Sequence, residues 1–422
     1  MHLLARSARL RGQKVNRKCG SGFNGYEKRL QHEAALENAP RTTCLKFQVP
    51  VTRVPVLSVR TSIPNAALFM LFLTGFPGFL GTRLVETMAA HDPSLQFALL
   101  VQPKFEAKAH TVLQRIDLTD RATVYPGDIT KPDLGLGDDY GSIARSITHA
   151  VHLAAVYDLT IPRDIGWRVN VTGTQHVLDC MASAPQLQTF GYVSTAYVSG
   201  KRKGRVLEDE LTHNTGFKNF YEETKYHAEV LVREHMDTVP TMVFRPGIVV
   251  GDSQTGETDK FDGPYFILRA LQRLPRYTVM ARVGDGTAPV HLTPVDYVIN
   301  AMAHLMRTPA HNGTTFHLTD PNALSTQQIM ETFVDQLDMH VAYLPVGPSF
   351  AGGVMGTAAG RYLGIAPELI DYFDHEVHYD TRRVEEALAG TGITCPSLTE
   401  YAPRMVAFMN AHRDQARSEA MY

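Results

Sequence analysis

The chain has 422 residues and a formal net charge of −2 at pH 7, a length that can bury a large core and that favours one sizeable α/β domain with a smaller appendage. The nearly balanced charge gives no argument for nucleic-acid binding. No run of eighteen apolar residues occurs, so at most peripheral membrane contact is expected. The four cysteines show neither metal-ligand nor disulfide spacing, which favours a reducing compartment and no metal site.

Residues 1–68 differ in charge from the rest of the chain. They hold twelve Lys and Arg against three acids, a net charge of +9, which leaves −11 for residues 69–422. An Arg-rich, acid-poor start resembles an organellar transit peptide, but its helical amphipathicity is weak. We therefore favour a disordered extension, or a gene-model artefact with translation starting at Met70, over targeting. The protein is expected in the cytoplasm, or in mitochondria if the extension is a transit peptide.

From Leu71 onward, short apolar strand patterns alternate with helical patterns. After the apolar run Phe69 to Leu73, strands are predicted at Gln96 to Val101, Ala122 to Tyr125, Ala150 to Ala154, Thr189 to Val193 and Thr241 to Phe244, and helices at Gly81 to Ala90 and Trp167 to Ala184. This alternation indicates right-handed βαβ crossovers in a mostly parallel sheet. Residues 69–250 are therefore predicted to form a Rossmann-type, doubly wound α/β domain that binds its ligand at the carboxyl ends of the strands.

The rhythm breaks down after Gly251 into pieces separated by Gly and Pro. A polar loop over Asp252 to Asp262 precedes short strands near Tyr277 to Val283 and Thr314 to Leu318, with helices near Val295 to Met306, Thr326 to Gln336 and Tyr401 to Asn410. We interpret residues 251–422 as a smaller α+β substrate-binding part, intertwined with the first domain. Its small-residue stretch from Gly352 to Gly360 is as compatible with loops as with a tunnel for an acyl chain.

A glycine-rich turn joins the first predicted strand to the first predicted helix. Its residues are Thr74, Gly75, Phe76, Pro77, Gly78, Phe79, Leu80 and Gly81. Such a turn places backbone N–H groups and the positive end of a helix around an anion, and glycine lets the backbone approach a pyrophosphate closely. Because a strand precedes the turn and a helix follows it, we favour dinucleotide binding over a purely structural turn.

The ends of the next three strands suggest how the rest of a dinucleotide is held. The second strand ends without the acidic residue that binds the ribose of NAD, and continues as Gln102-Pro103-Lys104. Lys104 could reach the 2′-phosphate of NADP or be a solvated loop charge, so NADP(H) is favoured over NAD(H). Asp128 and Ile129, after the third strand, could bracket the adenine. The residues after the fourth strand leave room for ribose and pyrophosphate: Leu153, Ala154 and Ala155.

Three side chains carry the expected chemistry. Tyr221 and Lys225 are four residues apart on a predicted helix and so share one face. A nearby ammonium is expected to lower the pKa of Tyr221 from its usual value of about 10, which would make the phenol an acid or base near neutral pH. The same ammonium could hold the hydroxyls of the nicotinamide ribose. Thr195, at the end of the fifth strand, would place a hydroxyl beside a carbonyl undergoing reduction.

Taken together, these motifs resemble the extended short-chain dehydrogenase/reductases. The residues that match the family's TGxxGxxG turn, adenine-contacting acid, NxxGT helix, Ser/Thr and YxxxK pair are Thr74 to Gly81, Asp128, Asn170, Thr195, and Tyr221 with Lys225. The resemblance covers the chain from about Leu71 to Leu318. It implies an NAD(P)-dependent oxidoreductase.

Residues 193–198, 224–229 and 245–249 are similar to one branch of this family, the male-sterility type, which contains fatty acyl-CoA reductases and thioester reductase domains. That branch reduces acyl thioesters with NADPH. By resemblance, Thr195 polarises the thioester carbonyl, Tyr221 protonates the developing oxyanion, and Lys225 orients cofactor and tyrosine. The nicotinamide end would be lined by Pro246, Gly247 and Ile248. The basic residue common in the branch after the second strand is Gln102 here.

The expected substrate is a small molecule, an acyl thioester or a related carbonyl. The alternatives are a nucleotide-sugar epimerase or dehydratase, a hydroxysteroid-type dehydrogenase, and a non-catalytic NAD(P)-sensing protein; the intact Thr195, Tyr221 and Lys225 disfavour the last. We interpret His291 as a packing residue first, and the metal-ligand residue types of Asp374 to His378 as a solvated face. The sequence leaves the oligomeric state open, a dimer included.

Overall fold

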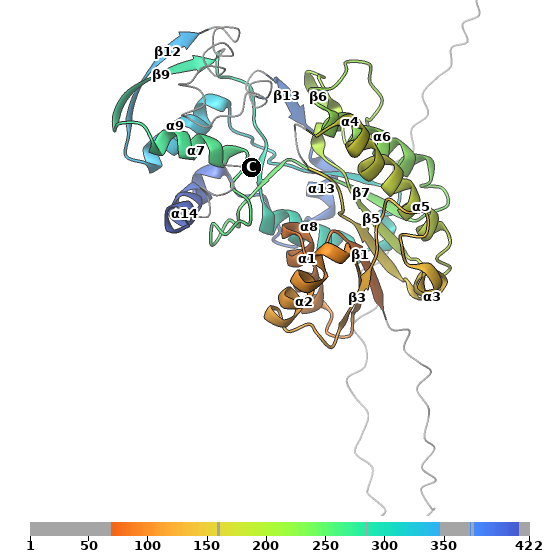
Figure 1. Cartoon of the computed structure of the whole chain (residues 1–422). Helices are drawn as coiled ribbons and strands as arrows, with labels where there is room; N and C mark the ends of the chain where they lie inside the picture. The colour runs from red at the N-terminus through yellow and green to blue at the C-terminus, as the bar shows by residue number, and fades with distance from the viewer. Residues whose placement is uncertain (1–68, 158–160, 284, 347–371, 373–374, 413–422) are drawn as a thin grey trace, which may run out of the picture. The chain divides into compact units, whose positions relative to one another are not determined.

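The computed structural model of the chain describes residues 69–157, 161–283, 285–346, 372 and 375–412 (Figure 1). All of these residues belong to one of the two units into which the chain divides, Pro64–Tyr422. The predictions for residues 1–68 and for the stretch from Gly352 to Gly360 lie outside the described residues.

Seven parallel strands form the central sheet, in the order β11-β7-β5-β4-β1-β2-β3. Their bounds are β1 Met70–Thr74, β2 Gln96–Val101, β3 Ala122–Pro126, β4 His149–His152, β5 Thr189–Val193, β7 Thr241–Pro246 and β11 Thr315–Leu318. Along the chain, strands are added outward from β1 to β3 on one side of the sheet, and then outward from β4 to β11 on the other side. The connections after β1 and β4 therefore leave in opposite directions, and a crevice opens at the carboxyl ends of these two strands.

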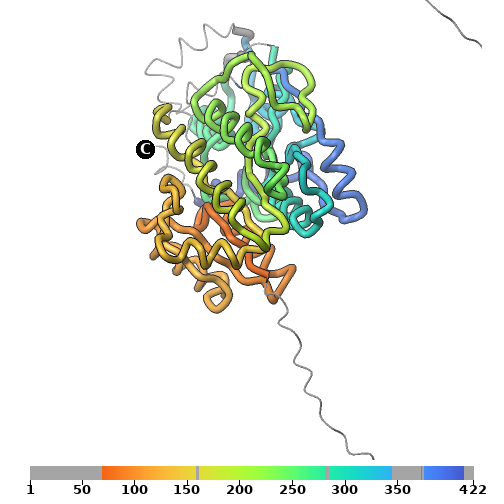
Figure 2. Tube along the Cα trace, turned by 90° about the vertical axis from the view of Figure 1, so that its right-hand side faces the viewer, coloured from red at the N-terminus to blue at the C-terminus, as the bar shows by residue number. Residues whose placement is uncertain are grey.

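Alternate side chains of the strands face two helical layers, because successive residues of a strand point to opposite faces. Leu71 and Leu73 pack with one layer and Phe72 with the other. The first layer contains α1 (Phe79–His91), α2 (Glu106–Arg115), α8 (Val295–Leu305) and α13 (Arg382–Ala387); the second contains α3 (Tyr140–Ser146), α5 (Gly173–Ala182) and α6 (Phe220–Glu234). Helices α5 and α6 face the viewer in Figure 2. Both faces of the sheet are thus covered, as parallel sheets require.

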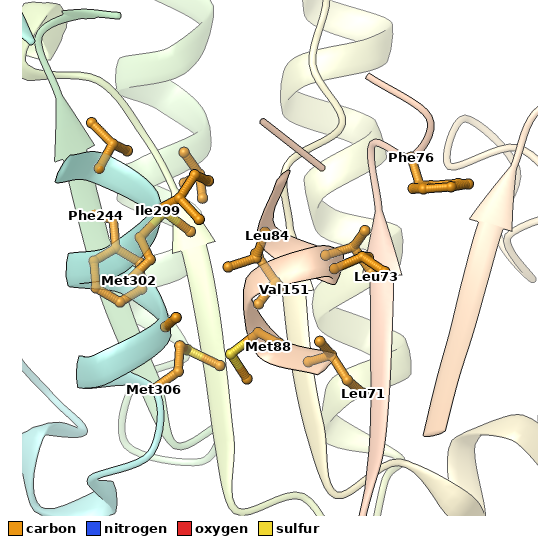
Figure 3. Packing of buried hydrophobic residues seen from close by; sticks show 14 of the residues in the cluster. Leu71, Leu73, Phe76, Leu84, Met88, Val151, Phe244, Ile299, Met302 and Met306 are labelled. Atoms are coloured by element: carbon orange, nitrogen blue, oxygen red, sulfur yellow. The ribbon is translucent and has the colours of Figure 1, made fainter. Parts of the chain in front are cut away.

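Helices α1 and α8 pack side by side on the sheet, although they are far apart in the sequence. Figure 3 shows their side chains meeting over the strands, with Leu84 and Met88 from α1, Met302 from α8 and Met306 just after the end of α8. None of these four side chains is more than 6% exposed. Because α8 and β11 both come after Gly251, the C-terminal part of the chain completes the core of the first domain.

The rest of the C-terminal part forms a smaller apolar cluster around α7 (Pro264–Gln272), α9 (Thr326–Gln336) and α14 (Leu398–Ala411). A parallel pair of strands, β9 (Tyr277–Val283) and β12 (His340–Val346), extends from it (Figure 1). Two short parallel pairs are β8 (Ile248–Val250) with β10 (Leu292–Pro294) and β6 (Gly204–Val206) with β13 (Val377–Tyr379). Shorter helical segments are α4 (Arg163–Gly166), a π-helix at Trp167–Thr172, and 3₁₀ turns at Pro103–Phe105, Gly137–Asp139, Ala196–Ser199 and Pro309–His311.

The predicted α/β fold and its mostly parallel sheet are confirmed. The predicted strands and helices occur within a few residues of their expected bounds, and β2, β5, β9 and α9 match them residue for residue. Among the elements that the sequence did not locate are α2, α3, α7, α13 and β12. Strand β12 is defined by pairing with β9, His340 opposite Tyr277, and a pairing between distant segments leaves no local pattern.

Leu84→Ala should destabilise the fold far more than Leu344→Ala. Leu84 is fully buried between α1 and the sheet, whereas 59% of Leu344 is exposed on β12. The first change removes buried methyl groups and leaves a cavity, which costs roughly 2–5 kcal/mol, while the second should cost less than about 1 kcal/mol. Urea denaturation followed by circular dichroism measures both free energies of unfolding. Equal losses would contradict this account of the core.

Candidate active site

A cavity of about 760 Å³ lies at the carboxyl ends of the central strands. Its walls come from the turn after β1, the ends of β4, β5 and β7, helix α6, and three later segments: 258–267, 290–292 and 326–330. This is the position where doubly wound sheets bind their ligands. The cavity therefore joins the parallel sheet to the smaller C-terminal cluster.

The glycine turn forms the cavity wall beside β1, and its glycines are required by close contacts. Gly75 has a φ of +97°, and a Cβ there would come within 2.8 Å of Leu153. A Cβ on Gly81 would come within 2.6 Å of the Gly75 carbonyl oxygen. Helix α1 begins after Gly78 without a side-chain cap, so its first N–H groups are free to meet an anion. The turn thus presents backbone rather than side chains to the cavity.

The wall beside β4 is held by a network below the turn. The Thr74 hydroxyl accepts a hydrogen bond from the Ala154 N–H at 3.2 Å and lies 2.7 Å from Nδ1 of His152. Nε2 of His152 lies 3.1 Å from the Thr174 hydroxyl. Burial lowers the pKa of His152 to about 3, helped by the Lys225 charge, so the imidazole is neutral. The network fixes Leu153 and Ala154 against the turn.

Thr195 and Tyr221 meet inside the cavity, as the sequence predicted. Thr195 is the second residue after the end of β5 and is 5% exposed. Tyr221 lies in the first turn of α6, which Asn219 caps by accepting a hydrogen bond from the Glu222 N–H at 3.0 Å. A hydrogen bond between the Thr195 hydroxyl and the Tyr221 phenol lowers the pKa of the phenol. The two hydroxyls can therefore act on the same substrate atom.

The expectation that Lys225 lowers the pKa of Tyr221 below its usual value is wrong. Burial raises the pKa of Tyr221 above 10, and the hydrogen bond with Thr195 offsets only part of this effect. Lys225 is not among the groups that shift this pKa, and its ammonium donates instead to Tyr192 Oη at 3.0 Å and to the Val193 carbonyl at 2.8 Å. At neutral pH the phenol is protonated, which suits a proton donor better than a base.

The pKa of Lys225 is also far from its usual value. It is 3% exposed, and burial lowers its pKa to about 7 although the Glu229 carboxylate favours the charged form. Lys225 also lines the cavity. A change in the charge of Lys225 near neutral pH therefore changes the electrostatic environment of the cavity.

Ser194, next to Thr195, is anchored by a buried ion pair. Its hydroxyl donates to Glu229 at 2.6 Å, and Glu229 pairs with Arg245 at 2.6 Å, with both side chains almost fully buried. Arg233 adds a second contact to the same carboxylate at 3.0 Å. Burial alone would raise the pKa of Glu229, but these arginines lower it to about 2. The end of β5 is thus tied to both α6 and β7.

Most of the cofactor residues expected from the sequence line one cavity. They are Gly75, Gly78, Phe79, Leu80, Gly81, Leu153, Ala154, Ala155, Tyr221, Lys225, Pro246, Gly247 and Ile248. Gly247 is needed for packing as well, because a Cβ there would come within 2.4 Å of the His291 carbonyl oxygen. The remaining residues of the turn, Thr74, Phe76 and Pro77, are buried and lie outside the cavity lining.

Five other expected cofactor residues lie outside the lining of this cavity. Gln102 and Lys104 follow β2, and Lys104 Nζ lies 4.8 Å from the Phe105 ring centre. Asp128 accepts from the N–H and hydroxyl of Thr130, both at 2.9 Å, and Ile129 packs in the core.

The side-chain amide of Asn170 is hydrogen-bonded to other groups of the protein. Its amide pairs with the backbone of Val156 and donates to the Thr224 hydroxyl at 3.0 Å. It therefore ties the loop after β4 to helix α6.

The far wall of the cavity was not predicted from the sequence. It contains Tyr157, Thr258, Lys260, Asp262, Phe266, Ile267, Val290, Leu292, Ile329, Met330 and Tyr372. The Tyr157 ring lies edge-on to Tyr221, 4.9 Å between centres. The only local signal was the polar loop Asp252 to Asp262, because residues on separate helices give no shared pattern.

Two classes of site are not found among the residues that the structure describes. No cluster of three or more His, Cys, Asp or Glu side chains could hold a metal ion there, and no helix in that part of the chain is long and apolar enough to cross a bilayer.

His291 is 3% exposed, and its two ring nitrogens lie 3.2 Å from the carbonyls of Asp320 and Val377. The interpretation of His291 as a packing residue is consistent with these contacts.

The site fits a nicotinamide dinucleotide. The glycine turn supplies an uncapped helix start for a pyrophosphate, the small residues after β4 leave space, and Thr195, Tyr221 and Lys225 stand together at the other end. Fold and site together define an NAD(P)-binding oxidoreductase of the extended short-chain dehydrogenase/reductase type.

Residues 73–302 match the family described as male sterility protein, and the chain belongs to this family. It is 25% identical over 271 residues to the fatty acyl-CoA reductase wat of Drosophila melanogaster, covering 55% of this chain and 52% of that protein. It is 29% identical over 280 residues to the glycine betaine reductase ATRR of Emericella nidulans, covering 61% of this chain and 21% of that protein. The chain thus spans about half or less of the length of these relatives.

A solved structure agrees with these relatives. The crystal structure of the terminal R domain from the myxalamid PKS-NRPS biosynthetic pathway superposes with a TM-score of 0.72 at 28% identity, and covers 83% of this chain and 92% of that one. The resemblance to the thioester reductase branch is confirmed.

Glu229→Gln should destabilise the protein by about 3–5 kcal/mol at pH 7, because it leaves Arg245 buried without its partner. Since the pKa of Glu229 is lowered in the folded state, its stabilisation is present above about pH 4.5 and is lost as the pH falls toward 2. The variant should therefore lose less stability than the wild type over that range. Urea denaturation at several pH values tests both effects.

Glu223→Gln is the matched control on the same helix. Glu223 pairs with Arg163, whose side chain is 53% exposed, so its loss should cost less than about 1 kcal/mol. Equal losses of stability in Glu229→Gln and Glu223→Gln would show that the buried Glu229–Arg245 pair stabilises the fold no more than the exposed pair does.

Proposed function

We propose that the protein reduces an acyl thioester of the fatty acyl-CoA type, or a related carbonyl compound, with NADPH as the reductant. The observation that carries this proposal is that one cavity contains both the Thr195, Tyr221 and Lys225 side chains and, on its far wall, a patch of six apolar side chains beside the polar Thr258, Lys260 and Asp262. A sugar nucleotide would favour Arg and Asn side chains, and neither residue type is among the described residues that line the cavity. The membership in the male sterility family and the similarity to a fatty acyl-CoA reductase support the same class of substrate.

The apolar wall is the proposed seat of the acyl chain. Helix α7 contributes Phe266 and Ile267, and α9 contributes Ile329 and Met330. Val290 and Leu292 lie between them in the lining. Each buried methylene of a chain on this surface gains roughly 0.8 kcal/mol, so longer chains should bind more tightly until the wall is filled.

The residues near Tyr221 have defined tasks in this reaction. NADPH, when bound, supplies the hydride that adds to the carbonyl carbon. The Thr195 hydroxyl donates a hydrogen bond to the carbonyl oxygen, on which negative charge develops. The protonated Tyr221 phenol gives its proton to that oxygen. The hydroxyl proton then passes to the leaving sulfur as the carbon–sulfur bond breaks, which releases an aldehyde and a thiol, and Tyr221 regains a proton from solvent. Lys225 holds the cofactor ribose with a charged N–H group.

NADPH is proposed over NADH because no carboxylate follows β2. The chain has Gln102 there, and Lys104 makes no ion pair among the described residues. Arg83 is a less suitable partner for a 2′-phosphate, since it is paired with Asp252 at 3.4 Å and Glu257 at 3.0 Å. Lys104 is therefore the proposed phosphate contact.

Tyr221→Phe should lower kcat for reduction by about 10²–10⁴-fold, the usual effect of losing a positioned proton donor, while NADPH still binds. The assay follows NADPH oxidation with acyl-CoA and with free aldehydes of several chain lengths, and repeats it with NADH. Tyr226→Phe is the control, because Tyr226 is on the same helix but packs against His213 and Phe217 outside the cavity.

Two results would reject the proposal. The first is no turnover of any acyl-CoA or aldehyde by the wild-type protein with either cofactor. The second is full activity in the Tyr221→Phe variant, which would favour a non-catalytic, cofactor-sensing protein.

A further inference from the structure

The Lys225 ammonium lies in a pocket built mainly by β5. It donates to Tyr192 Oη at 3.0 Å and to the Val193 carbonyl at 2.8 Å, and it lies 4.5 Å from the centre of the Tyr192 ring. Tyr192 is fully buried. Since an ammonium has three N–H donors, two are used by β5 and one is left to point into the cavity.

The Tyr192 hydroxyl belongs to a longer chain of buried polar groups. The neighbouring Thr174 side chain opposes the rise in the pKa of Tyr192 that burial causes, and the Thr174 hydroxyl donates to the Asn170 carbonyl at 2.6 Å. The proton of Thr174 is therefore committed, and the Tyr192 O–H can donate to the Thr174 oxygen. This direction leaves the lone pairs of Tyr192 for Lys225. The chain continues through His152 to Thr74 beneath the glycine turn.

We propose that Tyr192 is a positioning residue for Lys225: it aims the ammonium at the cofactor and keeps it charged when the cofactor arrives. This inference rests on the proposed function, because the task of Lys225 is to hold the cofactor ribose. Tyr192 does not line the cavity, so it acts through Lys225 and not by touching substrate.

The surroundings of Lys225 make its charge sensitive to this one hydroxyl. The titratable groups that face it are Glu229 and Tyr221 on α6, His152 on β4 and Tyr192 on β5. His152 and Tyr221 are both uncharged at neutral pH, since burial lowers the pKa of the first and raises that of the second. Glu229 favours the ammonium but is already shared between Arg245 and Arg233. The Tyr192 oxygen and the Val193 carbonyl are then the direct partners of the charge.

The test is cofactor binding as a function of pH, which needs no acyl substrate. The dissociation constants of NADPH and NADH are measured between pH 5.5 and 8.5 by nicotinamide fluorescence, for the wild type and for Tyr192→Phe. In the wild type, binding should weaken as the pH rises through the Lys225 pKa of about 7. In Tyr192→Phe this midpoint should fall by about one pH unit, because a partner of the charged form is lost.

The expected change in cofactor affinity follows from that shift of the midpoint. Binding by Tyr192→Phe should be up to about fivefold weaker than the wild type at pH 7 and nearly equal to it at pH 5.5, if the charged lysine is the binding form. Titration of the cofactor's own phosphate is common to all variants and cancels in the comparison. Tyr297→Phe, which removes a phenol oxygen from a buried tyrosine of α8, should leave the midpoint where it is in the wild type. Lys225→Met should remove the midpoint near pH 7 that Lys225 causes and leave only the pH dependence of the cofactor's own phosphate.

A purely structural role would weaken binding by the same factor at every pH, and an unchanged midpoint in Tyr192→Phe would overturn the proposal. If that variant does not fold, Thr174→Val tests the same link: it removes the hydroxyl next to Tyr192, and a smaller downward shift supports the proposal while no shift rejects it. Failure to reduce acyl-CoA would reject the proposed function without changing these binding curves.

Discussion

The close approach of the glycine turn to the end of β4 is the contact on which the site depends. Gly75 leaves no space for a Cβ beside Leu153, and the Thr74 hydroxyl accepts from the Ala154 N–H. These contacts join the two halves of the sheet at the point where the chain reverses its direction of growth. Because they are made by backbone and small side chains, the cavity above them remains open to a dinucleotide.

The polar groups beneath the cavity are held in place by specific hydrogen-bond and ion-pair partners. Lys225, Glu229, Arg245 and His152 are all almost completely buried, where an unpaired charge is very costly. Each is satisfied by a specific partner: two acceptors on β5 for the lysine, and the arginines for Glu229. The pKa values of the tyrosine and the lysine move in opposite directions, upward for Tyr221 and downward for Lys225, because burial favours the neutral form of both. A neutral phenol and an easily discharged ammonium follow from the same cause.

The sequence was sufficient for the fold and for the near half of the site. Strand and helix periodicity located the parallel sheet, and the glycine turn, Thr195, Tyr221 and Lys225 were recognised from their spacing and strand or helix positions. These features are local, so a single sequence contains them.

The remaining features depend on contacts between distant segments. The partner of Lys225 is Tyr192, which lies on another element and reads as an ordinary strand residue. The pKa of Tyr221 was mispredicted because helical spacing places the lysine on the same face but does not tell where its ammonium goes. The far wall combines α7 and α9, whose residues share no pattern along the chain, and the amide of Asn170 reads as a motif residue although its partners are Val156 and Thr224.

The central claim is that the cavity brings a reduced nicotinamide cofactor and an acyl thioester together for direct transfer. The most direct measurement uses NADPH deuterated at both C4 positions with a long-chain acyl-CoA, followed by mass spectrometry of the product. The account predicts an aldehyde with one deuterium on its carbonyl carbon and an equal amount of free thiol; an alcohol formed by a second reduction would carry two deuteriums. A product without deuterium, or thiol release without reduction, would contradict it.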